Sequence, residues 1–402
     1  MKFLIGLSFL LVTYFLYGFY INQYEMSVVP QQIKSEHASD TYDYKGVLNV
    51  HTELSIGSAS ASFVIQSAKM ADLDFVFFTD LNKFNMPTSL ESYHGNLLVF
   101  SGAKYSYLDS RLLFYSLDRT QVGDNLGEVQ VTLADLLSQK QGASKDTLLV
   151  LAHPYKAGFS WVGEIPTGLD GFELLNLKSL SNRAWQDSKA STIWSGLIYP
   201  FNPRLAFARL LSEPRDEIAL LDRLSQERKI NIYAGTEASA RAIPLANYLM
   251  RFPSYKRSFE IMSNHILLRS ELTGNFNNDR QKVFNALKNG NFYIALDILG
   301  DTKGFQATLV EPNKSHLMGS EVKLSKGLSL SVKLPSVPKD FYEIIVYRNG
   351  VVFGIFNEPE FVKAITEPGT YRVQVRVIPM LPLPDAKKWL TWIYTNPFYV
   401  VP

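Results

Sequence analysis

Polar side chains stand at the ends of four short apolar runs, where a buried strand by itself would not need them. The runs read LNVHTELSIGS, FFTDLN, LLVLAHPY and IYAGTEAS in chain order. Imidazole and carboxylate groups bind divalent metals and move protons, so their placement at strand ends indicates a reactive site. Side chains two residues apart on a strand share a face, so the Asn-x-His pair of the first run should converge, as should the Glu-x-Ser pair of the last. The candidate site residues from these runs are Asn49, His51, Asp80, His153, Glu237 and Ser239.

The ordered set resembles the polymerase-and-histidinol-phosphatase (PHP) family of metal-dependent phosphoesterases. Members of that family carry a His-x-His pair, a Thr-Asp-His, a Gly-x-Glu, a His-Pro and a closing Asp-x-His at the strand ends of a βα barrel, and bind divalent metals there. The order and spacing are similar in this chain, and the resemblance covers about residues 46–401. It extends to ELLN at 173–176, to FNALKNGNFYIA at 284–295 and to the tail WIYTNP at 392–397. The resemblance therefore implies a PHP-type barrel with a β-sandwich behind it.

The departures from the family pattern remove metal ligands. His51, Asp80 and His153 match the family, and Glu237 stands for its aspartate. The other compared positions have lost a good ligand: Asn49 and Ser239 replace histidines, Leu81 replaces the histidine after Asp80, and Lys104 replaces a glutamate.

A divalent ion needs about four to six donors, and an ammonium group about 4 Å away repels it by several kcal/mol even at an effective dielectric near 20. The sequence therefore favours a site with no cofactor. A single weak zinc, manganese or iron ion held by His51, His153 and Glu237 is the alternative, and a cluster of two or three metals is least favoured.

Two sets of roles follow from these alternatives. Without metal, Asn49, Lys104 and Ser239 are expected to bind a ligand, because the lysine keeps positive charge in a pocket that could hold a phosphate or carboxylate. With metal, activated water would attack phosphorus, and Asp80 and His153 would take the catalytic roles.

The N-terminus predicts a membrane segment. Residues Phe3 to Ile21 contain no charge, and these 19 residues would span roughly 28 Å as a helix, close to the thickness of a bilayer core. No Ala-x-Ala site follows, which favours an uncleaved signal anchor over a cleaved signal peptide, with a buried core helix least favoured. Lys2 precedes the segment and places the rest of the chain outside the cytoplasm, in a bacterial periplasm or at a cell surface.

Composition limits the function further. The formal charge of +2 argues against nucleic-acid binding, which needs a basic excess. The absence of cysteine excludes disulfides and thiolate sites. A chain of 402 residues with 46% apolar residues can fill two domains.

Short apolar runs alternate with helical patterns up to about residue 300, which predicts an α/β fold with a distorted βα barrel and mostly parallel strands. Short strands and turn signals then dominate, among them Asn349-Gly350, and predict a small antiparallel sandwich of immunoglobulin-like size. The expected organisation is a transmembrane helix (1–22), a linker (23–45), a barrel (46–300) and the sandwich (301–402).

Three functions remain open at this stage. The first is a non-catalytic binding or scaffold module, a pseudoenzyme whose sandwich contacts an envelope protein or glycan and whose pocket takes a phosphorylated small molecule. The alternative is a phosphoesterase with a reduced metal site, and the third is a purely structural envelope protein. The histidines outside the motifs are expected to be surface or packing residues: His37, His94, His265 and His316.

Overall fold

The computed structural model describes residues 2–25, 41–84, 88–118, 122–140, 145–245, 248–385 and 387–402. Most of the predicted linker, together with His37, lies outside these residues. The helices are α1 (Lys2–Asn22), α2 (Ala61–Met70), α3 (Leu126–Ser138), α4 (Leu177–Asp187), α5 (Lys189–Ile198), α6 (Pro203–Leu210), α7 (Arg215–Glu227), α8 (Tyr255–Phe259) and α9 (Phe276–Asn289), with single 3-10 turns η1 (Thr88–Leu90) and η2 (Asp297–Leu299).

Seven strands close into a barrel in the order β1-β2-β4-β5-β6-β7-β8, and β8 returns to pair with β1. All neighbours are parallel except β5, which is antiparallel to both β4 and β6. This confirms the predicted α/β class with mostly parallel strands, while β5 was not predicted. The bounds are β1 (Tyr42–Val50), β2 (Phe75–Leu81), β4 (Leu97–Tyr107), β5 (Ser110–Ser116), β6 (Thr147–Leu151), β7 (Gly171–Asn176) and β8 (Asn231–Ala238).

The apolar pattern explains why these segments are barrel strands. In β2, Phe75 and Phe77 pack in one cluster with α9, whereas Val76 and Phe78 pack in another with α2. A strand buried on both faces reads as a continuous apolar run, which is what this segment shows. The first strand begins at Tyr42, four residues before the predicted start, because its early residues pair with β11.

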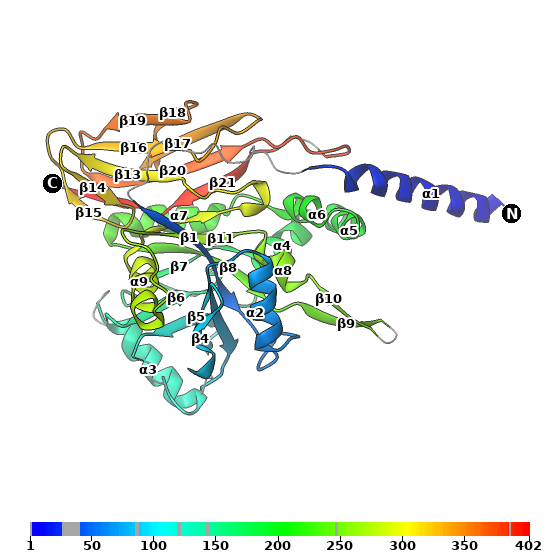
Figure 1. The fold of residues 1–402 in the computed structure, drawn as a ribbon, viewed down its shortest axis with the longest axis horizontal. Helices are drawn as coiled ribbons and strands as arrows, with labels where there is room; N and C mark the ends of the chain where they lie inside the picture. The colour runs from blue at the N-terminus through cyan, green and yellow to red at the C-terminus, as the bar shows by residue number, and fades with distance from the viewer. Residues whose placement is uncertain are drawn as a thin grey trace.

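The C-terminal strands form two groups that lie over one end of the barrel (Figure 1). One group is a four-stranded sheet, β14-β13-β16-β19. The other joins the barrel sheet directly, because β21 pairs with β12 and β12 pairs with β11. Buried residues of both groups contribute to one apolar core. An immunoglobulin-like arrangement stays a prediction. The bounds are β11 (Ser263–Leu268), β12 (Phe292–Ala295), β13 (Gln306–Glu311), β14 (Lys314–Leu317), β15 (Glu321–Lys323), β16 (Ser329–Lys333), β17 (Tyr342–Arg348), β18 (Val351–Phe356), β19 (Glu360–Ala364), β20 (Gly369–Val377), β21 (Leu390–Thr395) and β22 (Phe398–Val401).

The predicted Asn-Gly hairpin is confirmed. Arg348 pairs with Val351, so Asn349 and Gly350 alone make the turn between β17 and β18. Both have positive φ, 50° and 79°, which a two-residue turn of this kind requires. Two short ribbons complete the fold: β3 (Tyr93–His94) on β4, and the hairpin of β9 (Arg241–Leu245) with β10 (Tyr248–Phe252).

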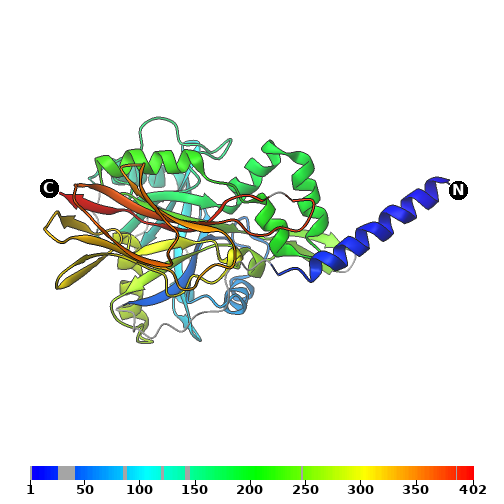
Figure 2. The same cartoon turned by 90° about the horizontal axis from the view of Figure 1, so that it is seen from above.

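Helix α1 is long and apolar enough to cross a membrane, and most of its surface is exposed. Its last turns pack on α5 and α6: the Tyr14 hydroxyl donates to the Leu197 carbonyl at 2.8 Å, and Asn202 Nδ2 donates to the Ile21 carbonyl at 2.8 Å. Gly18 lies against the Phe201 ring, where a Cβ would approach to 2.5 Å. Figures 1 and 2 show α1 running away from the body of the molecule at the end where α5 and α6 lie.

Candidate functional site

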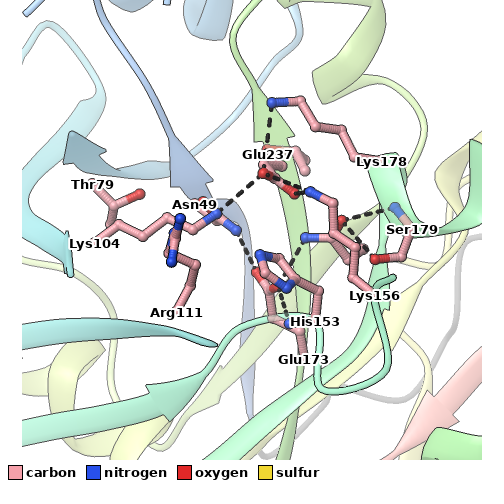
Figure 3. A network of polar contacts seen from close by, with 12 residues as sticks. Asn49, Thr79, Lys104, Arg111, His153, Lys156, Glu173, Lys178, Ser179 and Glu237 are labelled. Carbon is pink, nitrogen blue, oxygen red and sulfur yellow. Dashed lines mark hydrogen bonds and ion pairs between the residues drawn. The ribbon is translucent and has the colours of Figure 1, made fainter. Parts of the chain in front are cut away.

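A cavity of about 740 Å³ lies beside the carboxyl ends of the barrel strands. Lys104 on β4, His153 two residues after β6 and Glu237 on β8 line it, so the barrel closure brings together residues from distant parts of the chain. Lys156 and Lys178 also line it, from the segment after β6 and from α4 (Figure 3).

Glu237 is the centre of a cluster of lysines. Its Oε1 lies 3.2 Å from Lys104 Nζ, 3.3 Å from Lys156 Nζ and 3.5 Å from Lys178 Nζ. Burial alone would raise the pKa of the carboxyl, but the charges of Lys104, Lys178 and Lys156 outweigh burial and hold its pKa well below the usual value. Glu237 is therefore ionised, and its charge is already balanced by more than one cation.

A second carboxyl, Glu173 on β7, lies under this cluster. It accepts hydrogen bonds from Asn49 Nδ2 at 2.7 Å, from Asn176 Nδ2 at 2.8 Å and from the His153 backbone N–H at 2.9 Å. Burial raises the pKa of Glu173, which Lys104 partly offsets. Gly235 leaves room for it, because a Cβ there would lie 1.7 Å from Glu173 Oε1. Asn49 connects Glu173 to the lysine cluster, because Asn49 Oδ1 accepts a hydrogen bond from Lys104 Nζ at 3.3 Å.

The two motif histidines are buried and neutral. Burial, reinforced by the charge of Lys104, lowers the pKa of His51 well below its usual value and that of His153 to about 3. Neither ring nitrogen of His51 forms a well-shaped hydrogen bond, and neither does Nδ1 of His153. These atoms are polar groups without the partners that buried nitrogens normally have.

The backbone at three of these strand ends is strained. Asn49, His153 and Glu237 have φ values of 61°, 35° and 45°, in the left-handed region that non-glycine residues rarely adopt. At Asn49 the pairing of β1 with both β2 and β8 shifts register. Strain of this kind costs about 1–3 kcal/mol for each residue and clusters at functional sites, because the surrounding structure must hold it in place.

The structure places the other predicted residues as follows. Ser239 lines the cavity, whereas Asp80 is buried outside its lining. The Asp80 carboxylate accepts from the Thr52 backbone N–H at 2.8 Å and from the Thr52 hydroxyl at 2.7 Å, which fixes the turn after β1. The proposed roles of all these residues stay predictions.

Four cationic residues of the cavity lining fall outside the motif set, namely Arg111, Lys156, Lys178 and Arg241. Lys178 sits at the start of α4, two residues after the ELLN segment, and Arg111 lies on the unpredicted strand β5. Arg111 lines the cavity with its guanidinium 4.5 Å from the centre of the Phe159 ring. The only sequence signal for Lys178 is its position immediately after a strand end.

Outside this cavity, His265 lies in a buried cluster at the start of β1. Its Nδ1 is 2.7 Å from Asp43 Oδ1, its Nε2 is 3.4 Å from Asp297 Oδ1, and the Tyr293 hydroxyl donates to Asp43 Oδ2 at 2.7 Å. Burial alone would lower the pKa of His265, but the Asp43 and Asp297 carboxylates raise it to about 10. This residue is a charged link between β1, β11 and η2, and its partners were not foreseen from the sequence.

The donor set does not fit a divalent metal. Within the described ranges, no group of three or more histidine, aspartate or glutamate side chains is arranged to hold an ion. The free nitrogens of His51 and His153 would suit one, but the third candidate ligand, Glu237, is neutralised by ammonium groups on three sides. A cation brought to that carboxylate would meet those charges at close range.

No protein-family model matches the chain. No curated protein matches it either. Among solved structures it is similar to a two-domain protein from Bacteroides vulgatus that contains a predicted PHP-like metal-dependent phosphoesterase, with 10% identity, a TM-score of 0.42, and coverage of 90% of this chain and 98% of that one. It is also similar to a proposed metal-dependent phosphoesterase from Bifidobacterium adolescentis, with 13% identity, a TM-score of 0.25, and coverage of 51% and 92%.

Proposed function

We propose that this protein is a membrane-anchored, non-catalytic module that binds an anion, a phosphate or a carboxylate, at the strand ends of its barrel. The observation that carries the proposal is the ion pair between Lys104 and Glu237. It puts an ammonium group, 2% exposed, at the position where the resemblance implies a metal-binding glutamate.

The charge balance of the cavity supports an anionic ligand. Lys104, Lys156, Lys178 and Arg111 line it, and Glu237 is the ionised carboxylate that faces them. Charged groups in a partly buried site interact more strongly than in water, and ammonium and guanidinium groups form strong hydrogen bonds with phosphate oxygens. Glu237 has one negative charge and cannot neutralise all of these cations. A bound anion would balance the positive charge that remains.

A phosphoesterase with a reduced metal site is the second candidate. The His153 ring favours it, because this neutral imidazole lines the cavity and its Nδ1 has no well-shaped hydrogen bond, which leaves it available as a ligand. The His153 ring could instead donate a hydrogen bond to a bound anion, and this interpretation agrees with the neighbouring lysines.

The location and partners are also proposals. The positive charge of Lys2, at the N-terminal end of α1, supports a body outside the cytoplasm. A protein or glycan contact through the C-terminal strands is supported by apolar side chains exposed on β18 and β19, namely Val351, Ile355 and Val362.

Calorimetry on the full-length protein in lipid nanodiscs tests the proposal, with inorganic phosphate as the ligand and with or without chelator. We expect binding that chelator does not change. Because a hydrogen bond to a charged group is worth about 1.5–3 kcal/mol, Lys156→Met should weaken the affinity about tenfold to a hundredfold. Lys333→Met, which removes a surface lysine paired with Glu360, is the control and should have no effect.

Metal content and hydrolysis decide between the two candidates. The native protein should carry no stoichiometric zinc, manganese or iron and should not hydrolyse a generic phosphate ester. Activity should appear only when the family ligands are restored together by Asn49→His, Leu81→His, Lys104→Glu and Ser239→His. Stoichiometric metal, or native hydrolysis that His153→Ala abolishes, would replace the proposal with the phosphoesterase.

A further inference from the structure

We infer that the ligand of this cavity is an anionic amphiphile, a phosphate or carboxylate head joined to a hydrocarbon chain. The inference rests on the proposed anion site and deepens it, because it names the part of the ligand that the lysines do not bind.

The cavity has two chemically different walls. The strand ends and the first turn of α4 supply its cationic groups, whereas Tyr199, α6 and the end of β10 supply an apolar wall. In that wall the Tyr199 ring lies 4.4 Å from the Phe252 ring and 5.8 Å from the Phe207 ring, measured between centroids. Leu177 and Leu210 extend the same wall.

The size of the cavity argues against a small anion as the whole ligand. A volume of about 740 Å³ is within the range of about 300–1,000 Å³ that holds a complete organic ligand. Inorganic phosphate would occupy only the end near Glu237 and would leave the aromatic wall in contact with water. Filling that wall with hydrocarbon instead stabilises the complex by the hydrophobic effect.

Helix α5 connects this wall to the membrane segment. Thr192, Ser195 and Gly196 face the cavity from α5. The same helix contacts α1, through the Tyr14 hydroxyl bonded to the Leu197 carbonyl and through the Trp194 ring 5.5 Å from the Tyr17 ring. A single helix therefore separates the cavity from the helix that is suited to lie in lipid.

The test uses the full-length protein in nanodiscs of zwitterionic lipid, titrated by calorimetry with inorganic phosphate, butyl phosphate and octyl phosphate, and with empty nanodiscs subtracted. Each methylene that becomes buried should tighten the Kd roughly threefold to fourfold. Octyl phosphate should therefore bind at least a hundredfold more tightly than inorganic phosphate.

Gly196 allows the chain compartment to be blocked separately. It lies in the last turn of α5, it lines the cavity, and a Cβ there meets no atom within 4 Å. Gly196→Trp should fill this space and abolish the gain from the octyl chain. Ile193→Trp introduces the same side chain at an exposed position of α5 and serves as the matched control, with no effect expected.

The outcomes separate the two levels of the proposal. Tighter binding of octyl phosphate that depends on both Lys156 and the space at Gly196 supports the amphiphile. Competition by phosphatidate in the disc then identifies the bilayer as its source, and no competition identifies the aqueous phase. Equal affinity for octyl and inorganic phosphate overturns the amphiphile and leaves the anion site intact. Octanol binding as tightly as octyl phosphate also overturns it, and the absence of any phosphate binding overturns the proposed function itself.

Discussion

Replacing Glu237 by glutamine should destabilise the protein and make its stability depend on added anion. The carboxylate oxygen lies within 3.5 Å of three ammonium groups. At an effective dielectric near 20, each contact at this distance is worth about 5 kcal/mol before desolvation is counted. Glu237→Gln removes these attractions and leaves three cations that are all within about 7 Å of one another, with repulsion of about 2–3 kcal/mol for each pair.

The net cost is smaller than these gross energies, because the lysines regain hydration and one can lose its proton. Removing one partner from a buried ion pair typically costs about 3–5 kcal/mol, and we expect Glu237→Gln to lower the free energy of unfolding by that amount. Phosphate would then replace the missing charge. If the variant binds phosphate with a Kd tenfold lower than that of the wild type, saturating phosphate will stabilise the variant by about 1.4 kcal/mol more than it stabilises the wild type.

Urea unfolding of the full-length protein in detergent, followed by tryptophan fluorescence with and without phosphate, measures both effects. Glu360→Gln is the control: it removes a carboxylate that is 62% exposed and 3.5 Å from Lys333, and it should change stability by less than about 0.5 kcal/mol. The reasoning is refuted if Glu237→Gln is as stable as the wild type and phosphate stabilises both proteins equally.

Two further predictions concern other parts of the molecule. The pKa of His265 in the folded protein, about 10, lies above the value near 6.5 expected in an unfolded chain, so its stabilisation is complete below about pH 6.5 and is lost as the pH rises towards 10. His265→Gln should therefore lower the free energy of unfolding by about 3–5 kcal/mol at pH 6. In this variant the free energy of unfolding should fall less steeply between pH 7 and 10 than in the wild type. The same pH dependence in the variant and the wild type would contradict this assignment. Gly18→Leu should push α1 away from the segment between α5 and α6, because a Cβ at Gly18 would lie 2.5 Å from the Phe201 ring, at a cost of about 1–3 kcal/mol. The expected result is a red shift of Trp194 fluorescence. Gly6→Leu is the control and should leave the spectrum unchanged, because a Cβ at Gly6 meets nothing within 4 Å. An unchanged spectrum for both variants would disprove the docking of α1.

Local pattern was sufficient to predict most elements of the fold. Buried barrel strands are continuous apolar runs, and β2 was found for that reason. The Asn-Gly turn needs positive φ at two positions, so its residue types alone located the hairpin. Strand β5 was missed, because nothing local distinguishes an antiparallel strand inserted in a parallel barrel.

The candidate site was only partly predictable. Lys104 was identified because it replaces a ligand in an ordered motif. Lys178 and Arg111 belong to no motif, and they reach the cavity only because α4 and β5 are placed there by the closed barrel. The partners of His265 were invisible for a similar reason: Asp43 and Asp297 are separated from it by 222 and 32 residues. Pairing at such a distance depends on tertiary structure.

The pairing of β12 with β21 has a consequence for any attempt to cut the protein in two. Tyr293, Ile294 and Ala295 use Thr395, Tyr394 and Ile393 as their strand neighbours. A chain that stopped near residue 300 would leave the backbone amides and carbonyls along the outer edge of β12 unpaired. An unpaired strand edge forms hydrogen bonds with the strands of other chains. The first 300 residues expressed alone should therefore self-associate or precipitate, because the C-terminal strands permanently cover this edge of the barrel sheet.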